Sequence, residues 1–165
     1  MLILAELELT QQNVSVTPEV HIFEIQYRSA DYDRALELRE RVLRAPLGLT
    51  FSKKQLKAES EECHVVAQSA GGEILASASI VWKAPTTAKL RQVVVAPDFQ
   101  SQGLGTRIVQ FAESIAQQKE RTLIYCHARK PVTAFYTKLG FQIVGSQFEE
   151  IGIDHFRMEK GIPPR

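Results

Sequence analysis

Residues 90–106 read LRQVVVAPDFQSQGLGT, and the rest of the chain is organised around this stretch. We expect a buried strand over residues 90–96, a short turn at Pro97 and Asp98, and a loop with two glycines over residues 100–105. An amphipathic helix is expected to begin at the end of the loop. A strand that leads through free backbone amides into a helix N-terminus is suited to holding phosphate groups. The segment is therefore interpreted as a loop that binds the pyrophosphate of a nucleotide-like cofactor.

Two better-known glycine loops do not fit this stretch. Gly103 and Gly105 are not followed by the Gly-Lys-Ser/Thr of a P-loop. Ile108 stands where the dinucleotide-binding fingerprint has its third glycine. The alternative that stays open is a tight strand-to-helix turn without a ligand.

The bulk properties favour a single ordinary globular domain. The chain has 165 residues and a formal net charge of +1, so composition gives no reason to expect a nucleic-acid or membrane partner. Cys63 and Cys126 form no CxxC or zinc-ligand spacing, so we expect no metal and two reduced buried thiols. Cys126 as a nucleophile is the alternative. Glu6 and Glu8 interrupt the apolar start, which argues against a signal peptide and favours a cytoplasmic protein.

Strands come in series before the glycine loop, and helix and strand alternate only after it, which favours an α+β fold. Ser29 or Asp31 is expected to cap the first helix, Ser52 the second, and Gly71-Gly72 to form a hairpin turn. Pro131 opens the last helix and Gly140 ends it. The expected strands cover residues 21–27, 64–68, 73–82, 89–96, 123–126, 141–144 and 155–159, and the expected helices residues 32–44, 52–61 and 104–119, with a loop at 127–130.

A second motif follows the glycine loop by some thirty residues, and together the two motifs indicate which kind of ligand the loop binds. Gln100-x-x-Gly103-x-Gly105 and Ala134-x-Tyr136-x-x-x-Gly140-Phe141 occur in this order. With both motifs, the chain resembles the GCN5-related N-acetyltransferase (GNAT) superfamily, and more loosely a bacterial subgroup with small-molecule or uncharacterised substrates. The resemblance covers about residues 27–160, and either motif alone would be only suggestive.

The resemblance implies a three-layer α/β/α domain over residues 21–160, between an N-terminal arm (1–20) and a C-terminal tail (161–165). Its central sheet would be mixed, mostly antiparallel, with six to seven strands and a V-shaped splay that holds acetyl-CoA. Backbone groups of Val93 and Val95 would bind the pantetheine arm, and the glycine loop the pyrophosphate. The implied cofactor-binding residues are Val93, Val94, Val95, Gln100, Ser101, Gln102, Gly103, Leu104, Gly105 and Thr106.

The implied reaction is direct attack of an acceptor amine on the thioester, without an acyl-enzyme. Tyr136 matches the family position whose hydroxyl protonates the departing thiolate, and an unperturbed phenol with a pKa near ~10 can donate at neutral pH. The alternative for Tyr136 is an aromatic side chain packed beside Val132 and Phe135. A backbone N–H near residues 93–95 would polarise the thioester carbonyl.

The general base does not carry over from the family. Arg91 and Gln92 stand where many relatives have a glutamate. His155 is the leading candidate because histidine titrates near neutrality and the last strands usually border the acceptor cleft. A water chain or no base at all stays open, as do His64, His127 and Glu150.

The acceptor is not specified by the sequence. Residues 38–48 cover the region where the family builds its acceptor pocket, and Arg39, Arg41 and Arg44 could either bind an acidic acceptor or form a solvated face. The acceptor would be a small-molecule or peptide amine, and a homodimer stays open. A non-catalytic acyl-CoA-binding module or sensor on the same fold is the competing function.

Overall fold

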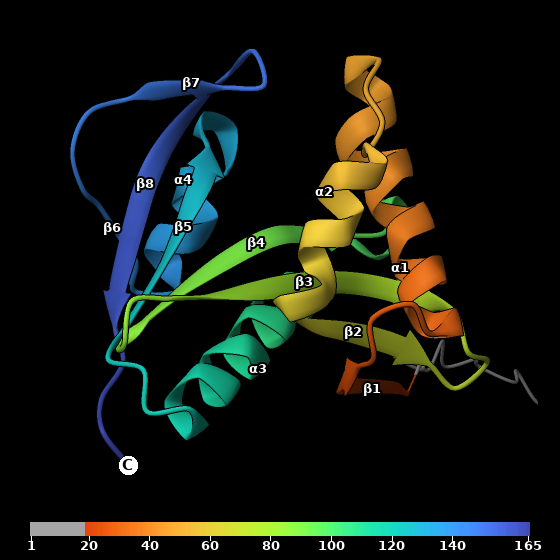
Figure 1. Ribbon diagram of the computed structural model, residues 1–165, viewed down its shortest axis with the longest axis horizontal. Helices are drawn as coiled ribbons and strands as arrows, with labels where there is room; N and C mark the ends of the chain where they lie inside the picture. Colours follow the sequence, from red (N-terminus) through yellow and green to blue (C-terminus); the bar gives the residue numbers. More distant parts are fainter. Residues whose placement is uncertain (1–18) are drawn as a thin grey trace, which may run out of the picture.

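The computed structural model describes residues 19–165, so the expected N-terminal arm (residues 1–20) lies almost wholly outside the described residues. Figure 1 shows the arrangement of the elements. Their order is β1 (Val20–Ile25), α1 (Ala30–Arg39), α2 (Lys53–Ala58), β2 (Cys63–Ser69), β3 (Ile74–Lys83), β4 (Thr87–Val95), α3 (Leu104–Gln118), β5 (Leu123–Arg129), α4 (Thr133–Lys138), β6 (Gln142–Ile143), β7 (Phe148–Glu150) and β8 (Ile153–Gly161).

One sheet runs through the described part of the chain. Its strand order is β1-β2-β3-β4-β5-β8-β6, with β7 also paired to β8. The β4–β5 pair is parallel and the others are antiparallel, which confirms the mixed, mostly antiparallel sheet. Residues 19–165 contribute eight strands instead of six to seven, and the strand that was not expected is β7, which is only three residues long.

Helices cover both faces of the sheet, as the three-layer expectation requires. Leu38 of α1 belongs to one buried cluster with Val66 of β2. Ile108 of α3 belongs to the other cluster with Val65. Successive residues of a strand point to opposite faces, so α1 and α3 lie on opposite sides of the sheet. We call these the α1 face and the α3 face.

Local capping explains where the helices begin. The Ser29 side chain, rather than that of Asp31, accepts a hydrogen bond from the Tyr32 amide at the start of α1. Ser52 and Gln55 form a reciprocal capping box at the start of α2. These polar caps fix the positions of two short helices that have little apolar pattern of their own.

The first helix does not stop at its last α-helical residue. A π-helical turn, η1 (Glu40–Arg44), and a 3-10 turn, η2 (Ala45–Leu47), continue it, and Pro46 lies inside that last turn. Gly48, with φ +68°, ends the helical path. The extension places Arg44 near the C-terminal end of this long helical segment.

The expected loop at residues 127–130 is wrong for its first three residues. β5 continues to Arg129 because β8 pairs with it antiparallel as far as Arg129 and His155. At the other end of the β5–β8 pair, Gly161 is the last residue of β8, and the amide of buried Ile162 donates to the Thr122 carbonyl at 2.8 Å.

No helix within residues 19–165 is long and apolar enough to cross a membrane.

Candidate active site

The sheet opens between β4 and β5. The two strands pair from Thr87 and Leu123 to Leu90 and Cys126, and then they separate. Figure 1 shows β4 turning toward α1 while β5 rises beside β8. Past Leu90, the edge of β4 that faces the opening has no strand partner among the described residues. An extended ligand could therefore pair with this edge like an added strand.

A bulge bends β4 just inside the opening. Ser79 pairs with Arg91 and Ser77 with Val94, so one residue of β3 lies opposite both Gln92 and Val93. Gln92 has φ +52°, which is uncommon for a residue with a side chain. β-Bulges increase local twist and are frequent beside active sites. This bulge helps to turn the free edge of β4 toward the opening.

The glycine loop presents backbone amides beside this free edge. Ser101 has φ +61° and Gly103 has φ +80°, and Gly103 is the N-cap of α3. Within residues 19–165, no backbone acceptor pairs with the amides of residues 101–106. A run of unpaired amides at the start of a helix favours an anion.

Two glutamine side chains hold the loop in shape. The amide of Gln100 donates to the carbonyl of Val95 at 3.1 Å, and that of Gln102 donates to the carbonyl of Asp98 at 3.2 Å. Both bonds tie the loop back to the segment that enters it. The side chains thus support the loop while its backbone amides stay available.

Gly105 has a different role from Gly103. Its backbone has no positive φ, but a Cβ there would lie 3.3 Å from two ring carbons of Phe135 and 3.6 Å from Val95 Cγ2. The missing side chain lets α4 pack directly on the first turn of α3. Sequence reasoning assigned Gly105 to close approach of the ligand; its position indicates close packing of two helices.

Tyr136 lies at the apex of the opening, on the α3 face. It is 7% exposed and makes edge contacts with Phe135 and Phe141, with ring centroids 5.0 and 5.5 Å away. Burial raises the pKa of Tyr136 above its ordinary value, and the neighbouring Cys126 raises it further. Cys126 is the last residue of β5 that pairs with β4. The phenol therefore stays protonated near the point where the strands part.

Three titratable side chains gather on the α1 face of β5, β7 and β8. Glu150 Oε1 lies 3.4 Å from His127 Nδ1, and Glu150 Oε2 lies 3.8 Å from His155 Nε2. His155 Nδ1 lies 2.7 Å from the carbonyl of Ile153, which can only accept, so this nitrogen carries the proton. One carboxylate thus bridges two histidines from neighbouring strands.

The two histidines differ in access. His155 is 4% exposed and stacks beside Phe148, whereas the His127 side chain is 24% exposed. His127 follows Cys126 directly, so it lies closer to the point where the strands part. Burial and the nearby Lys89 ammonium lower the pKa of His127, and Glu150 opposes the change. A histidine with a lowered pKa is neutral at pH 7 and able to accept a proton.

Strand alternation separates His155 from Tyr136. His155 pairs with Arg129, and paired residues share a face, so it lies with His127 on the α1 face. Tyr136 packs in the cluster on the α3 face with Cys126. Groups on the two faces can meet only in the opening between β4 and β5.

His64, another candidate for the base, is 4% exposed, and its Nε2 lies 2.9 Å from the Glu59 carbonyl, so it is held by local structure.

The three arginines near the first helix have three different environments. Arg39 is 2% exposed and binds both carboxylate oxygens of Glu59 at 3.0 to 3.1 Å. Arg41 is exposed on the outer side of the helix. Arg44 is half-buried and stacks over the Phe51 ring at 4.4 Å. Of these three arginines, Arg39 is paired with a carboxylate and Arg41 is exposed to solvent, whereas the Arg44 guanidinium is half-buried and has no carboxylate partner among the described residues.

Comparison with known proteins decides the family. Residues 43–162 match the profile of the family described as "Acetyltransferase (GNAT) domain". The chain belongs to the GNAT acetyltransferase family. The family prediction made from the two sequence motifs is thereby confirmed.

This GNAT chain is similar to a curated protein in sequence and to several solved structures in fold. The chain is 38% identical over 76 residues to the uncharacterized protein YyaT of Bacillus subtilis; the match covers 46% of the chain and about half, 51%, of that relative. A putative N-acetyltransferase from Lactobacillus plantarum has a similar fold, with a TM-score of 0.78 and 18% identity over 87% of this chain and 99% of that one. The structure of an aminoglycoside 6'-N-acetyltransferase in complex with coenzyme A has a TM-score of 0.72 and 17% sequence identity, over 88% of this chain and 98% of that one.

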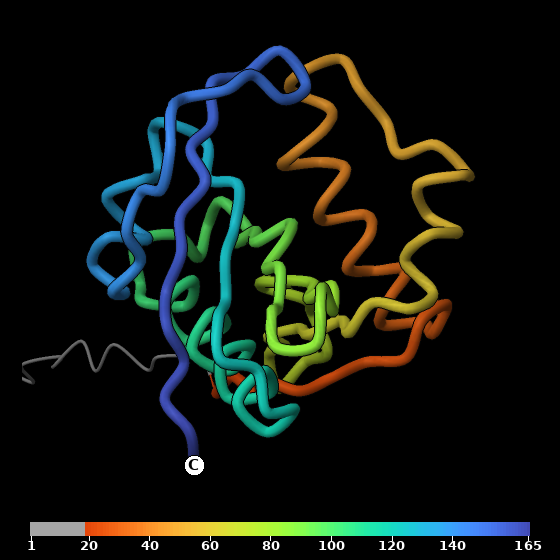
Figure 2. The backbone as a smooth tube through the Cα atoms, turned by 60° about the vertical axis from the view of Figure 1, so that its left-hand side comes forward, coloured from red at the N-terminus to blue at the C-terminus, as the bar shows by residue number. Residues whose placement is uncertain are grey.

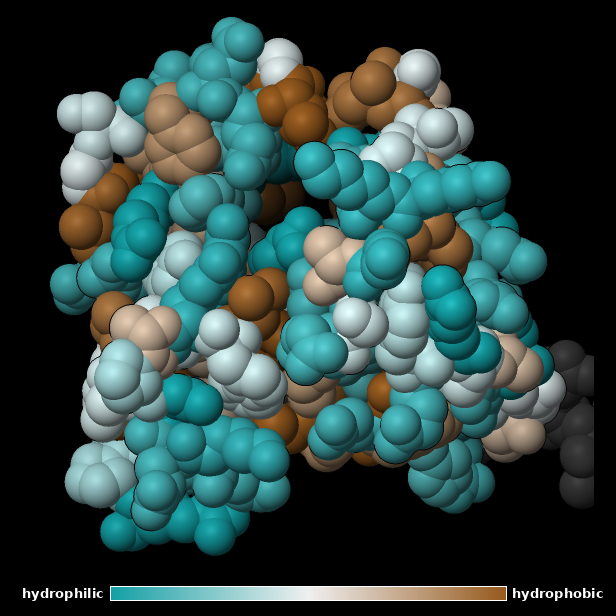
Figure 3. All heavy atoms as spheres, in the orientation of Figure 1, coloured by the Kyte–Doolittle hydropathy of each residue, from teal (hydrophilic) through white to brown (hydrophobic). Residues whose placement is uncertain are grey.

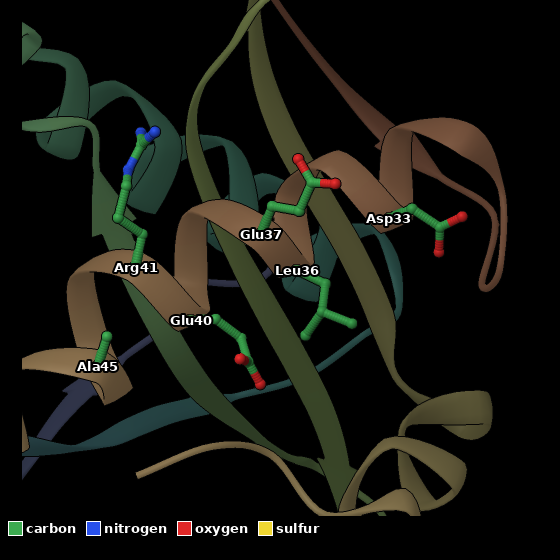
Figure 4. Close-up of a pocket in the computed structure, with 6 residues that line it drawn as sticks. All are labelled: Asp33, Leu36, Glu37, Glu40, Arg41 and Ala45. Carbon is green, nitrogen blue, oxygen red and sulfur yellow. The ribbon is translucent and has the colours of Figure 1, made fainter. Parts of the chain in front are cut away.

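A pocket of about 500 Å³ on this GNAT domain follows α1 and its extension from Asp33 to Ala45. Figure 4 shows its lining along one side of the first helix and its extension, with carboxylates on either side of Leu36. Arg41, from the sequence candidates, lines it. Leu38 packs inward from the same helix, so this pocket is on the outer surface. We assign it no part in acetyl transfer.

The GNAT structure also bears on the two cysteines and on metals. Burial raises the pKa of both the Cys63 and Cys126 thiols to about 12, and both are free. A thiol that stays protonated is a poor nucleophile, so the alternative role of Cys126 as a nucleophile loses support.

Within residues 19–165, no group of three or more His, Cys, Asp or Glu residues is arranged to hold a metal ion.

Sequence reasoning missed Glu62 and the pairing of Arg91. The Glu62 side chain is 5% exposed, with Oε1 2.5 Å from Arg91 and with Oε2 buried without a partner among the described residues. Arg91 directly precedes the bulge in β4, so the ion pair lies beside it. The contact joins residues 29 apart in the chain, and no local pattern signals it.

Proposed function

We propose that this protein transfers an acetyl group from acetyl-CoA to an amine by direct attack. The observation that carries the proposal is the parting of β4 and β5 after Leu90 and Cys126, with Tyr136 at the apex and free loop amides beside it. Family membership supports acetyl transfer, and a structurally similar aminoglycoside acetyltransferase has been seen with coenzyme A.

The donor half of the site rests on backbone groups. The unpaired edge of β4 at residues 93–95 is proposed to bind the pantetheine arm, and the amides of residues 101–106 the pyrophosphate. Acetyl-CoA supplies an acetyl group activated as a thioester. A backbone N–H beside the bulge at Gln92 is proposed to hold the thioester carbonyl oxygen.

Proton transfer is proposed to use groups on both faces of the sheet. Tyr136 is proposed to donate its proton to the departing thiolate; burial raises its pKa, so the phenol carries that proton at neutral pH. On the α1 face, the cluster of His127, Glu150 and His155 accepts the proton of the attacking amine. His155 was the leading base from sequence; the greater exposure of His127 makes it the member that meets the amine.

The two thiols support a cytoplasmic location. Free, buried Cys63 and Cys126 fit a reducing environment, so we place the reaction in the cytoplasm. The competing function, a non-catalytic acyl-CoA sensor, would use the same loop and β4 edge without proton transfer.

Release of free thiol from acetyl-CoA across a panel of primary amines tests the proposal. We expect at least one amine to raise the rate above that in water, and Gly103→Val to lose both that rate and CoA binding. CoA binding by calorimetry without amine-dependent thiol release would favour the sensor. Absence of CoA binding in the folded wild type would contradict both functions.

A further inference from the structure

Two arginines from the two arms of the opening lie near each other. Arg44 is the last residue of η1, and Arg129 is the last residue of β5. The Arg129 guanidinium donates to the Leu43 carbonyl at 3.1 Å, which places it beside the end of η1. Figures 1 and 2 show the two elements on opposite sides of the open end of the sheet. Figure 3 shows a recess between the arms, with hydrophilic residues on its walls.

Neither arginine has an anionic partner among the residues that the structure describes. Within residues 19–165, the arginines that form ion pairs are Arg34, Arg39, Arg91 and Arg157. Arg44 and Arg129 are nonetheless half-buried. A partly desolvated charge without a counter-ion is unfavourable, and a bound anion would relieve that cost.

The charges around the pair do not balance. Burial lowers the pKa of Arg44, and the charges of Arg129, Arg91 and Arg39 lower it further, while Glu150 alone opposes them. Burial also lowers the pKa of Lys89, which lies on the same face. Two nearby carboxylates are already paired, since Glu62 binds Arg91 and Glu59 binds Arg39, which leaves Glu150 as the negative charge acting on Arg44. The α1 face of the opening therefore has an excess of positive charge.

The arginines are also held in place before any ligand arrives. The Arg44 guanidinium lies over the Phe51 ring, 4.4 Å from its centroid, and Phe51 is 8% exposed. The Arg129 side chain is fixed through one nitrogen, so its other N–H groups remain to donate. A planar guanidinium binds carboxylate and phosphate oxygens through two parallel hydrogen bonds, and fixing it beforehand reduces the entropy lost on binding.

We propose that the acceptor is an amine that also carries an anionic group, a carboxylate or a phosphate, bound between Arg44 and Arg129. The role as acceptor rests on the proposed acetyl transfer, whereas the anion site does not. The site lies on the α1 face, while the loop for the pyrophosphate packs with the α3 face. The anion would hold its amine toward the histidine cluster that lies beside it.

Matched acceptors test the preference. Amino carboxylates of increasing chain length are compared with their carboxamides, and an aminoalkyl phosphonate with its neutral diester, by thiol release from acetyl-CoA. We expect kcat/KM to be roughly 10- to 100-fold higher for one of the anionic amines than for its neutral partner, mostly through KM. Preference for a carboxylate or a phosphonate identifies the source of the anion. Equal rates for every pair would overturn the proposal.

Variants locate the preference. Arg44→Gln should lose the preference for the anionic amine, and Arg44→Lys should retain part of it. Arg41→Gln is the matched control, since Arg41 lies three residues earlier on the same helical path and is exposed. Loss of preference in Arg41→Gln, or its full retention in folded Arg44→Gln and in Arg44→Gln/Arg129→Gln, would contradict the assignment.

A binding measurement separates failure of this proposal from failure of the proposed function. Glutarate and propylphosphonate, which lack an amine, are titrated into the protein with CoA present. Binding of either anion to the wild type and to Arg41→Gln, and its loss in Arg44→Gln, supports the anion site even where no amine is acetylated. Absence of binding of both anions to the wild type would overturn the site, whatever the transfer activity.

Discussion

The Phe135 ring occupies the space that a side chain at Gly105 would need, with ring carbons 3.3 Å from the position of its Cβ. Gly105 belongs to the first turn of α3, which follows the cofactor loop, and Phe135 precedes Tyr136 on α4. The first turn of α3, which follows the loop proposed to bind the donor, thus contacts the helix that carries the proposed general acid. This contact separates the effects expected at the two glycines.

Gly103→Val is expected to act on the loop itself. A side chain at φ +80° costs about 1–2 kcal/mol, and a branched one would also crowd the amides proposed to bind the pyrophosphate. We expect CoA affinity by calorimetry to fall at least tenfold. Gly145→Val is the control, since Gly145 has φ +79° and nothing within 4 Å of a Cβ. Equal CoA affinity in folded Gly103→Val and wild type would remove the loop from the donor site.

Gly105→Ala is expected to act through Phe135. The ring must shift by a few tenths of an ångström, which displaces the neighbouring Tyr136, so kcat should fall more than CoA affinity. The double variant Gly105→Ala/Phe135→Leu should recover part of kcat, because the smaller side chain leaves room for the methyl group. Strictly additive losses in the double variant would show that the contact does not matter.

The sequence predicts the position of the glycine loop and the helix caps better than the environments of the three arginines. Gly103, Tyr136 and the caps at Ser29 and Ser52 are local signals, readable from a few neighbouring residues. The extension of β5 to Arg129 depends on pairing with β8, more than twenty residues later. Arg39, Arg41 and Arg44 look alike in sequence, yet distant partners give each a different environment. Long-range contacts of this kind leave no local pattern.

His127 is expected to control the acid limb of the pH profile. It must be neutral to accept a proton, and its pKa is lowered, so kcat/KM should fall as pH drops through a midpoint below its ordinary value of about 6.5. Charged groups around it are Lys89 from β4, Glu150 from β7 and Arg157 from β8. Lys89→Met should move the midpoint upward, because it removes a neighbouring positive charge.

Substitution of each histidine identifies the base. His127→Gln should lower kcat/KM by about 100-fold or more and abolish the acid limb, whereas His155→Gln should retain the limb. The reverse pattern would return the role to His155. An unchanged profile in both variants would favour a water chain or no base.

Glu59 is expected to be the most sensitive buried polar side chain. It binds Arg39 through both oxygens and accepts from the Tyr32 hydroxyl at 2.6 Å. Glu59→Gln leaves a buried guanidinium without a counter-charge, and should lower the free energy of unfolding by about 3–5 kcal/mol. Arg34→Gln breaks an exposed pair with Asp31 and should cost about 1 kcal/mol or less. Urea denaturation measures both, and similar losses would contradict the buried network.

Replacement of Tyr136 tests the central claim most directly. Tyr136→Phe removes the hydroxyl and keeps the ring packed between Phe135 and Phe141. With the best acceptor of the amine panel, we predict that kcat falls by about 100-fold or more while the Kd for CoA stays within about twofold. Equal kcat values for Tyr136→Phe and wild type, at equal CoA affinity, would contradict Tyr136 as the general acid.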